Sequence, residues 1–366
     1  MNKGVLSPFP YYGGKAEMAL DIAEMLDYNA TCYIEPFGGS AKVLLNKPRH
    51  GVEIYNDSGL GVSAFMHLMS QEGTARELIS RIYKTDNSRE EFKRALDYKN
   101  IFDVDISRQL KKGFESALKG LLVKYGFLSP RSGYSKFREV LGDYESVLRV
   151  ILPQCTKEEI GRLMYALDEY EKSITSDNSI KKGFDLPEEW RGVHTTNYLT
   201  DYDLAVATYV VFAQSRDGMG KYWSTVKYGG SYEKYIKQMD RLYDIAERLN
   251  GVVVHGAVDA LAFIKYSGYL NNEDAIIYLD PPYLSVDEEK DLGRAYKESY
   301  KKSDHIIMLE AIQDAKAKIL LSNYDAPVFD EYLTPDKGWK RYEHKTTTVL
   351  RRKGERDSVE VIWYNY

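Results

Sequence analysis

Asp280-Pro281-Pro282-Tyr283 combines residue types that suit the binding of an exocyclic amine. It follows a hydrophobic run at residues 275–279, which predicts a buried parallel strand. The carboxylate therefore falls at the carboxyl end of a strand, where open α/β sheets bind ligands. The two prolines stiffen the turn and remove two N–H donors, which leaves nearby carbonyls available. This predicts a corner that holds an amine while a ring stacks on the attached base. The alternative is an ordinary strand exit with a packed tyrosine.

A second candidate site is the glycine-containing turn Glu35-Pro36-Phe37-Gly38-Gly39-Ser40, between a strand predicted at 31–34 and a helix predicted from 41. Glycines let the backbone approach a ligand closely, and a helix N-terminus is weakly positive. The spacing matches neither a dinucleotide fingerprint nor a P-loop, so a nucleoside fits better than a pyrophosphate. A tight turn without a ligand is the alternative interpretation.

Two further segments fit a nucleoside site. Asp57 ends a strand predicted at residues 51–55, about 20 positions beyond the glycines, where an acidic side chain accepts ribose hydroxyl hydrogen bonds. A simple turn cap is the alternative for Asp57. Tyr11-Tyr12-Gly13-Gly14-Lys15 precedes a helix predicted to end near Leu26, and its aromatic residues suit a lid over a ligand.

The elements that position these motifs form an interrupted α/β pattern. Strand patterns return at residues 252–254, 275–279, 317–321 and 359–364, whereas residues from 60 to about 246 carry mostly helical periodicity. We therefore expect an α/β catalytic domain from residues 1–59 and 250–366. Residues 60–249 are expected to form a mostly helical insertion.

Composition narrows the class of protein. The 366 residues are 43% hydrophobic and 29% charged, which is typical of a soluble globular chain. We expect no membrane span, no signal peptide and no metal-ligand cluster, and the two cysteines are too few for a disulfide framework. Although the net charge is −5, Lys and Arg outnumber Asp and Glu at residues 76–138 and at residues 337–356. These local basic segments favour a nucleic-acid partner.

Taken together, the motifs resemble a Dam-like DNA adenine-N6 methyltransferase of the phage, D12-type class, in which the cofactor motif comes first and the catalytic motif last. Ser322-Asn323-Tyr324-Asp325 and the closing run at residues 360–366 are also similar to segments of that family. The resemblance implies a Rossmann-like methyltransferase sheet with a large helical target-recognition insertion.

The resemblance also implies roles for individual residues. Catalysis falls to Asp280, Pro281, Pro282 and Tyr283. The implied cofactor is S-adenosylmethionine, and its binding falls to Tyr11, Lys15, Glu35, Pro36, Phe37, Gly38, Ser40, Asp57, Asp259 and Asp280. Contacts with DNA are assigned to Arg216, Lys221, Trp223 and Tyr296, with ordinary packing or solvation as the alternative for each of the first three. The loop at residues 216–223 lacks the Asn-rich pattern of GATC-recognising members.

The implied reaction is methyl transfer to N6 of a flipped-out adenine in double-stranded DNA, in the cytoplasm of a bacterium or a phage-infected host, with a cognate restriction enzyme as a second candidate partner. Two alternatives stay open. A cytosine-N4 or RNA adenine-N6 methyltransferase uses the same amine chemistry, although the motif order favours DNA adenine. A DNA-binding module with an inactive methyltransferase fold is the other, and the intact motifs argue against it.

Overall fold

The computed structural model describes residues 4–11, 13, 15, 18–124, 126, 128–129, 198–215, 218–224, 232–256, 260–284, 300–344 and 359–366. The chain divides into two compact units, one formed by residues 1–99 and 199–366 and the other by residues 100–198. The first unit contains the sheet and every described segment of the candidate site, so it is the unit that matters for the chemistry.

The described strands form one seven-stranded sheet in the order β3-β2-β1-β4-β5-β7-β6. The first five strands of that order run parallel, whereas β7 is antiparallel to both β5 and β6. Their bounds are β1 Cys32–Glu35, β2 Val52–Tyr55, β3 Val253–Val254, β4 Ala275–Leu279, β5 Lys318–Tyr324, β6 Lys340–His344 and β7 Glu360–Tyr364. The predicted α/β, Rossmann-like fold class is confirmed.

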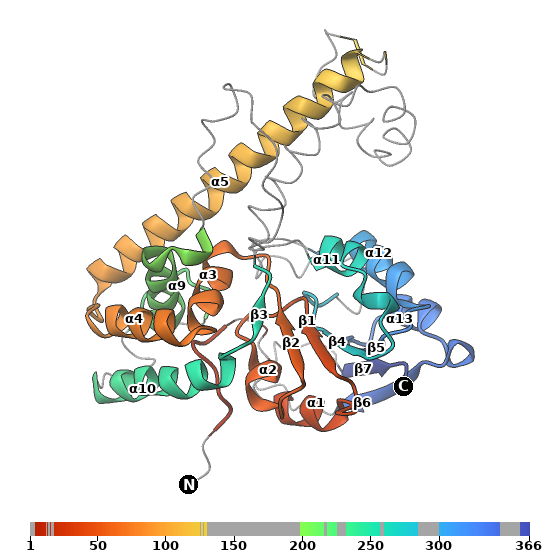
Figure 1. The fold of residues 1–366 in the computed structure, drawn as a ribbon, viewed down its shortest axis with the longest axis horizontal. Coiled ribbons are helices and arrows are strands. Elements are labelled where there is room, and N and C mark those ends of the chain that lie inside the picture. Colours follow the sequence, from red (N-terminus) through yellow and green to blue (C-terminus); the bar gives the residue numbers. More distant parts are fainter. Residues whose placement is uncertain are drawn as a thin grey trace, which may run out of the picture. The chain divides into compact units, whose positions relative to one another are not determined.

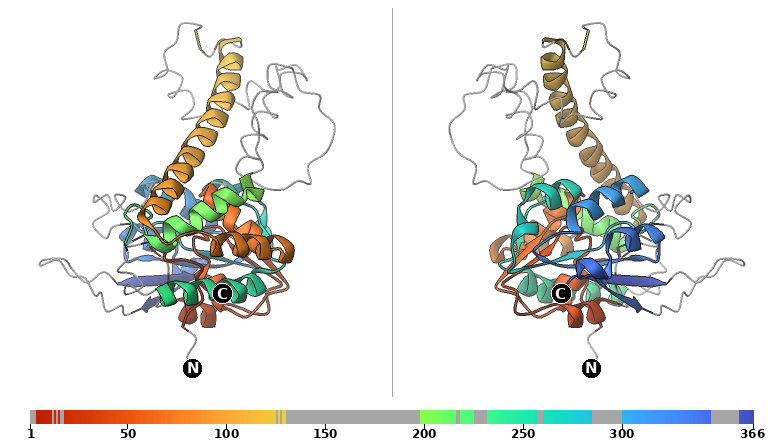
Figure 2. Two further views of the ribbon diagram at one scale, coloured as in Figure 1. Left: turned by 90° about the vertical axis from the view of Figure 1, so that its left-hand side faces the viewer. Right: turned by 90° about the vertical axis from the view of Figure 1, so that its right-hand side faces the viewer.

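Helices cover both faces of the sheet. One group contains α1 (Ala19–Met25), α2 (Lys42–Asn46) and α10 (Tyr232–Leu249), and the other contains α11 (Ala260–Tyr266), α12 (Lys302–Ile312) and α13 (Pro327–Tyr332). Figures 1 and 2 show α11 and α12 on the opposite side of the sheet from α1 and α10. All residues of β1 and β4 are buried, because helices cover them on each side. This explains why both strands have continuous hydrophobic sequences.

The predicted strands agree with the structure except for β6. Lys340–His344 was interpreted as part of a basic segment, but it pairs with β7 at the edge of the sheet. Four of its five residues are exposed, so no alternation of apolar and polar side chains marks it as a strand. The first helix also begins later than expected, at Ala19 rather than near Lys15.

The described residues between 60 and 249 are mostly helical. These form α3 (Leu60–Met69), α4 (Glu72–Tyr83), α5 (Arg89–Lys124), α9 (Tyr202–Gln214) and α10, with a short 3-10 turn at Tyr198–Thr200. The second compact unit spans only residues 100–198 and is therefore smaller than the predicted insertion. Helices α3, α4, α9 and α10 belong to the same unit as the sheet. Which residues recognise the target sequence stays a prediction.

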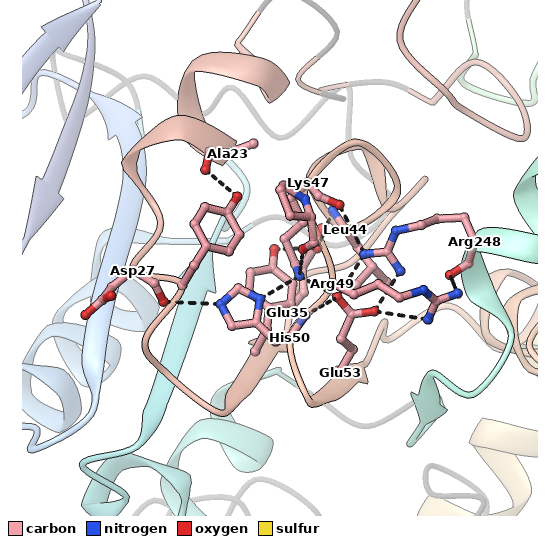
Figure 3. A network of polar contacts seen from close by, with 12 residues as sticks. Ala23, Asp27, Glu35, Leu44, Lys47, Arg49, His50, Glu53 and Arg248 are labelled. Carbon is pink, nitrogen blue, oxygen red and sulfur yellow. Dashed lines mark hydrogen bonds and ion pairs between the residues drawn. The ribbon is translucent and has the colours of Figure 1, made fainter.

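A polar network joins α10 to the β1–β2 side of the sheet (Figure 3). Arg248 donates to both oxygens of the Glu53 carboxylate, at 2.6 and 2.8 Å, and Lys47 Nζ lies 2.5 Å from the same carboxylate. Lys47 Nζ is also 2.8 Å from His50 Nδ1 and 4.1 Å from the centre of the Tyr33 ring. Burial lowers the pKa of Lys47 to about 8, against the opposing effect of the hydrogen bond that Lys47 donates to Glu53. The network fixes the end of α10 against the strands that carry the glycine turn.

Candidate active site

The strand order places the two main motifs beside each other. The chain continues from β1 toward one edge of the sheet and from β4 toward the other, so the adjacent pair β1 and β4 forms a topological switch point. Ligands of open α/β sheets bind in the crevice outside the carboxyl ends of such a pair. Glu35 ends β1 and Asp280 follows β4, so both motifs border this crevice.

The glycine turn after β1 is held by β2. The Gly38 N–H donates to the Asn56 carbonyl at 2.8 Å, and the Tyr55 hydroxyl donates to the Gly39 carbonyl at 2.6 Å. A Cβ atom at Gly38 would overlap the Tyr55 ring, so only glycine fits there. Gly39 has φ +48°, and Ala41 has φ +53°, a conformation that costs a non-glycine residue about 1–2 kcal/mol. Such local strain is frequent in turns that bind ligands.

Asp57 connects this turn to the end of β2. One carboxylate oxygen accepts from the Gly39 N–H and the other from the Gly59 N–H, both at 2.8 Å. Asp57 is therefore a structural link in the turn as well as the residue predicted to bind ribose hydroxyls.

Asp280, Lys15 and Tyr283 form a compact cluster at the carboxyl end of β4. Lys15 Nζ lies 2.7 Å from Asp280 Oδ1 and 4.1 Å from the centre of the Tyr283 ring. Burial by itself favours the neutral amine of Lys15, but the Asp280 carboxylate outweighs it and raises the pKa above its ordinary value. Lys15 therefore carries a proton and contacts both side chains that the sequence assigns to the target base.

Glu35 is the buried acidic residue of the site. Its Oε2 accepts hydrogen bonds from the Tyr33 hydroxyl at 2.8 Å and the Leu44 N–H at 3.2 Å. Burial raises the pKa of Glu35 to about 8; the Tyr33 bond opposes that shift and the negative charge of Asp280 adds to it. A nearby cation would stabilise the ionised form, because an opposite charge offsets desolvation.

Tyr11 lies beside the glycine turn. Its ring centre is 5.1 Å from that of Phe212 on α9, and a Cβ at Gly39 would lie 3.0 Å from the Tyr11 ring. The loop after α9 packs on the same segment, since a Cβ at Gly218 would lie 3.0 Å from the Pro10 backbone. The predicted aromatic lid and part of the predicted DNA-binding loop are therefore neighbours.

The residues predicted to contact DNA, together with Asp259, fall into two groups. Lys221 is exposed and Trp223 is half-buried, and the loop that carries them is closed by a bridge between Ser215 and Trp223. Arg216, Asp259 and Tyr296 lie outside the described residues.

The structure adds residues that the sequence prediction omitted from the site. Ser322 Oγ donates to Asp280 Oδ1 at 3.2 Å and is 3.1 Å from the Tyr278 hydroxyl, while Asn323 accepts from the Leu284 N–H. Their sequence signal was a polar pair at the carboxyl end of a hydrophobic strand. The family resemblance includes this segment, but only the strand order shows that β5 lies beside β4 and so brings the segment to Asp280.

Two searches over the described part of the chain gave negative results. No helix there is long and apolar enough to cross a membrane. No group of three or more His, Cys, Asp or Glu residues is arranged there to hold a metal ion.

Comparison with known proteins identifies a family. Residues 134–348, more than half of the chain, match the model of the D12 class N6 adenine-specific DNA methyltransferase. A search of curated proteins gave no match. The matched range contains Asp280 to Tyr283, while Lys15 and the glycine turn precede it and are brought to Asp280 by the fold. The family match confirms the resemblance drawn from the motifs, and the chain therefore belongs to the D12 class of N6 adenine-specific DNA methyltransferases.

Proposed function

We propose that this enzyme transfers the methyl group of S-adenosylmethionine to N6 of an adenine flipped out of double-stranded DNA, with Asp280 as the acceptor for the target amine. The observation that carries the proposal is the cluster of Asp280, Lys15 and Tyr283 at the switch point beside a strained glycine turn. The cluster combines an ion-paired carboxylate with an aromatic ring, and the turn supplies close backbone approach for a nucleoside.

The side chains of the crevice fit the proposed cofactor. S-adenosylmethionine carries a sulfonium, an ammonium and ribose hydroxyls, and the crevice contains the acidic residues Glu35, Asp57 and Asp280. Glu35 Oε1 accepts no hydrogen bond from the described residues, so it is available to a cationic ligand. Asp57 is assigned to the ribose hydroxyls, and the Tyr11 ring to contact with the cofactor beside Gly39.

The proposed chemistry follows from the weakness of the nucleophile. The lone pair of the adenine amine is delocalised into the ring, so the nitrogen gains nucleophilicity as its hydrogens are bound and its geometry becomes tetrahedral. Asp280 and the Pro281 carbonyl accept those two hydrogens and offset the positive charge that grows on nitrogen. Fixed electrostatic groups of this kind are often the largest catalytic contribution. Bound S-adenosylmethionine supplies an activated methyl group, so the protein chiefly aligns the reactants.

The target base must leave the duplex before it reaches this crevice, because a stacked base is inaccessible to the Asp280 carboxylate. Tyr283 provides a ring on which the flipped base stacks. Lys15 lies over that ring and pairs with Asp280, and it keeps the buried carboxylate charge-balanced when no amine is bound. Lys221 and Trp223 are assigned to DNA contact, as are Arg216 and Tyr296.

The test is identification of the methylated product. Double-stranded DNA and, in parallel, RNA are incubated with the protein and S-adenosylmethionine, digested to nucleosides and analysed by mass spectrometry, and N6-methyl-2′-deoxyadenosine from DNA is the expected product. Methylated cytosine, or a product formed from RNA only, would instead support the alternative methyltransferase. Failure to label any nucleic acid would favour the inactive DNA-binding module. Single-molecule sequencing of DNA from expressing cells then reports the recognition sequence.

A further inference from the structure

Ser322 and Asn323 occupy the carboxyl end of β5, directly beside the catalytic turn. Leu321 of β5 pairs with Leu279 of β4, so the next residues along the two strands, Ser322 and Asp280, are neighbours at the sheet edge. Both Ser322 and Asn323 are 0% exposed. Polar side chains buried this completely normally have hydrogen-bonding functions, since burial without a partner is costly.

Ser322 contacts one particular oxygen of the catalytic carboxylate. Its Oγ donates to Asp280 Oδ1 at 3.2 Å and meets the Tyr278 hydroxyl at 3.1 Å. Lys15 Nζ approaches the same Oδ1 at 2.7 Å, whereas Oδ2 accepts no hydrogen bond from the described residues. Two donors on Oδ1 fix the rotamer of Asp280 and leave Oδ2 as the acceptor for a substrate.

Asn323 holds the other end of the turn. Its Oδ1 accepts the N–H groups of Leu284 at 3.0 Å and of Tyr324 at 2.9 Å. Pro281 and Pro282 have no N–H, so the turn between Asp280 and Leu284 has few donors of its own with which to fix its conformation. The Leu284 N–H is one of the few that exist, and Asn323 binds it.

We propose that Ser322 and Asn323 are positioning residues for methyl transfer: Ser322 orients the Asp280 carboxylate so that Oδ2 faces the target amine, and Asn323 fixes the end of the same turn. The proposal rests on the proposed function, because it takes Asp280 as the acceptor of the amine hydrogens. Neither residue touches the substrate, so each acts through the Asp280–Leu284 turn.

The test of the first half is Ser322→Ala. Loss of one hydrogen bond to a charged group is expected to lower kcat about ten- to hundredfold. The dissociation constant for S-adenosylmethionine, measured by calorimetry, should change less than about twofold. The acid limb of the pH profile of kcat/KM should move to higher pH, because the Ser322 hydroxyl stabilises the ionised carboxylate. A residue with only a packing role would not move that limb.

Two variants control this experiment. Tyr278→Phe removes the other contact of Ser322 but leaves the bond to Asp280, and it should retain nearly normal kcat and an unchanged acid limb. Ser322→Thr keeps a hydroxyl and should recover a large part of the lost kcat. An active wild-type enzyme together with normal kcat and an unmoved acid limb in Ser322→Ala would overturn the role of Ser322. An inactive wild-type enzyme would instead indicate failure of the proposed function.

The test of the second half is Asn323→Ala, with a control residue that contacts the same strand. Asn365 bonds the Ile319 N–H at 2.7 Å and the Ala317 carbonyl at 3.0 Å, at the opposite end of β5 from the site. Both alanine variants should lose thermal stability, but only Asn323→Ala should lose kcat, by about tenfold or more. Equal kcat in the two folded variants would remove Asn323 from the proposal.

Discussion

At the residue scale, the site is a set of buried acidic groups, each held by donors of the protein. Lys15 pairs with Asp280, and Glu35 is held by the Tyr33 hydroxyl and the Leu44 N–H. Because each carboxylate has at least one protein donor, the crevice keeps its acidic groups in fixed orientations before a ligand arrives. Preorganisation of this kind is what makes single substitutions here informative about chemistry rather than only about folding.

Asp280→Ala is expected to abolish methyl transfer, because the main acceptor for the amine hydrogens is lost. Cofactor binding should persist in part, since Glu35 and Asp57 are untouched. Transfer of a labelled methyl group to DNA measures the first effect, and calorimetry with S-adenosylmethionine measures the second. Full turnover by this variant would refute the assignment of Asp280.

Asp57→Ala is expected to weaken cofactor affinity by about tenfold or more, because the side chain both links the glycine turn and is assigned to the ribose hydroxyls. Asp57→Asn keeps an acceptor and should lose less. Calorimetry on the two variants gives the comparison, and an unchanged dissociation constant in Asp57→Ala would remove this residue from the site.

His305 on α12 provides a prediction on stability. Burial lowers its pKa to about 4, and the ring centres of Tyr300 and Phe329 lie 5.4 and 5.6 Å away. The unfolded chain binds a proton at this residue below about pH 6.5, whereas the folded protein does not until about pH 4. Stability should therefore fall as the pH drops from about 6.5 to about 4, by at most about 3 kcal/mol from this group.

His305→Phe keeps an aromatic ring and removes the titration, so its loss of stability over that pH range should be smaller than that of the wild type. Urea unfolding at pH 7 and pH 5 measures the difference in the free energy of unfolding. Parallel losses in both proteins would contradict the lowered pKa.

At the element scale, the residues at the carboxyl ends of β1, β2, β4 and β5 together line the crevice. Tyr55 of β2 and Asn56, which follows it, hold the glycine turn, and the β5 residues Ser322 and Asn323 contact the Asp280 turn. Each turn of the candidate site is thus fixed by contacts with the neighbouring strand as well as by its own sequence. The register of parallel strands sets which residues meet, so it determines the site as much as the motifs do.

Gly38→Ala should disrupt this arrangement, because the added Cβ overlaps the buried Tyr55 ring. We expect a loss of stability of about 1–3 kcal/mol and weaker cofactor binding. Gly73→Ala is the matched control: this glycine lies in α4 with no atom within 4 Å of an added Cβ. The control should gain up to about 1 kcal/mol, since alanine favours helix. Thermal unfolding and calorimetry separate the two, and normal cofactor affinity in a folded Gly38→Ala protein would count against the proposed role of the turn.

At the scale of the whole molecule, residues far apart in sequence form one site. Lys15 and Asp280 make an ion pair although the helical region of the chain lies between them. Strands that precede this region in the sequence and strands that follow it belong to the same sheet. The chain thus contains the unit with the sheet and a second compact unit of residues 100–198. With a net charge of −5, binding to DNA must depend on local basic groups rather than on overall charge.

Lys221→Ala is therefore expected to weaken DNA binding by a similar factor for all sequences and to reduce the salt dependence of binding by about one unit of slope. Lys316→Ala is the control, because Lys316 is exposed and lies just before β5, at the opposite end of that strand from the site. Fluorescence anisotropy with duplex DNA at several salt concentrations gives both the dissociation constant and its salt dependence. Equal slopes for the two variants would exclude Lys221 as a phosphate contact.

The sequence by itself determined the fold class and the principal motifs. Hydrophobic runs such as Ala275–Leu279 predict buried strands because burial on both faces of a parallel sheet selects apolar side chains at every position. Glycines and prolines at strand ends predict turns because few residues can adopt those conformations. Lys340–His344 was missed because an exposed edge strand has no burial pattern to report.

Only the tertiary structure decided which residues meet. The partners of Asp280 are Lys15, near the start of the chain, and Ser322, on the adjacent strand, and no local pattern links them to it. The strand order β2-β1-β4-β5 sets these contacts through hydrogen bonds between strands that are distant in sequence. Motifs specify which chemical groups are available, whereas strand order and register specify which oxygen of Asp280 the described residues hold.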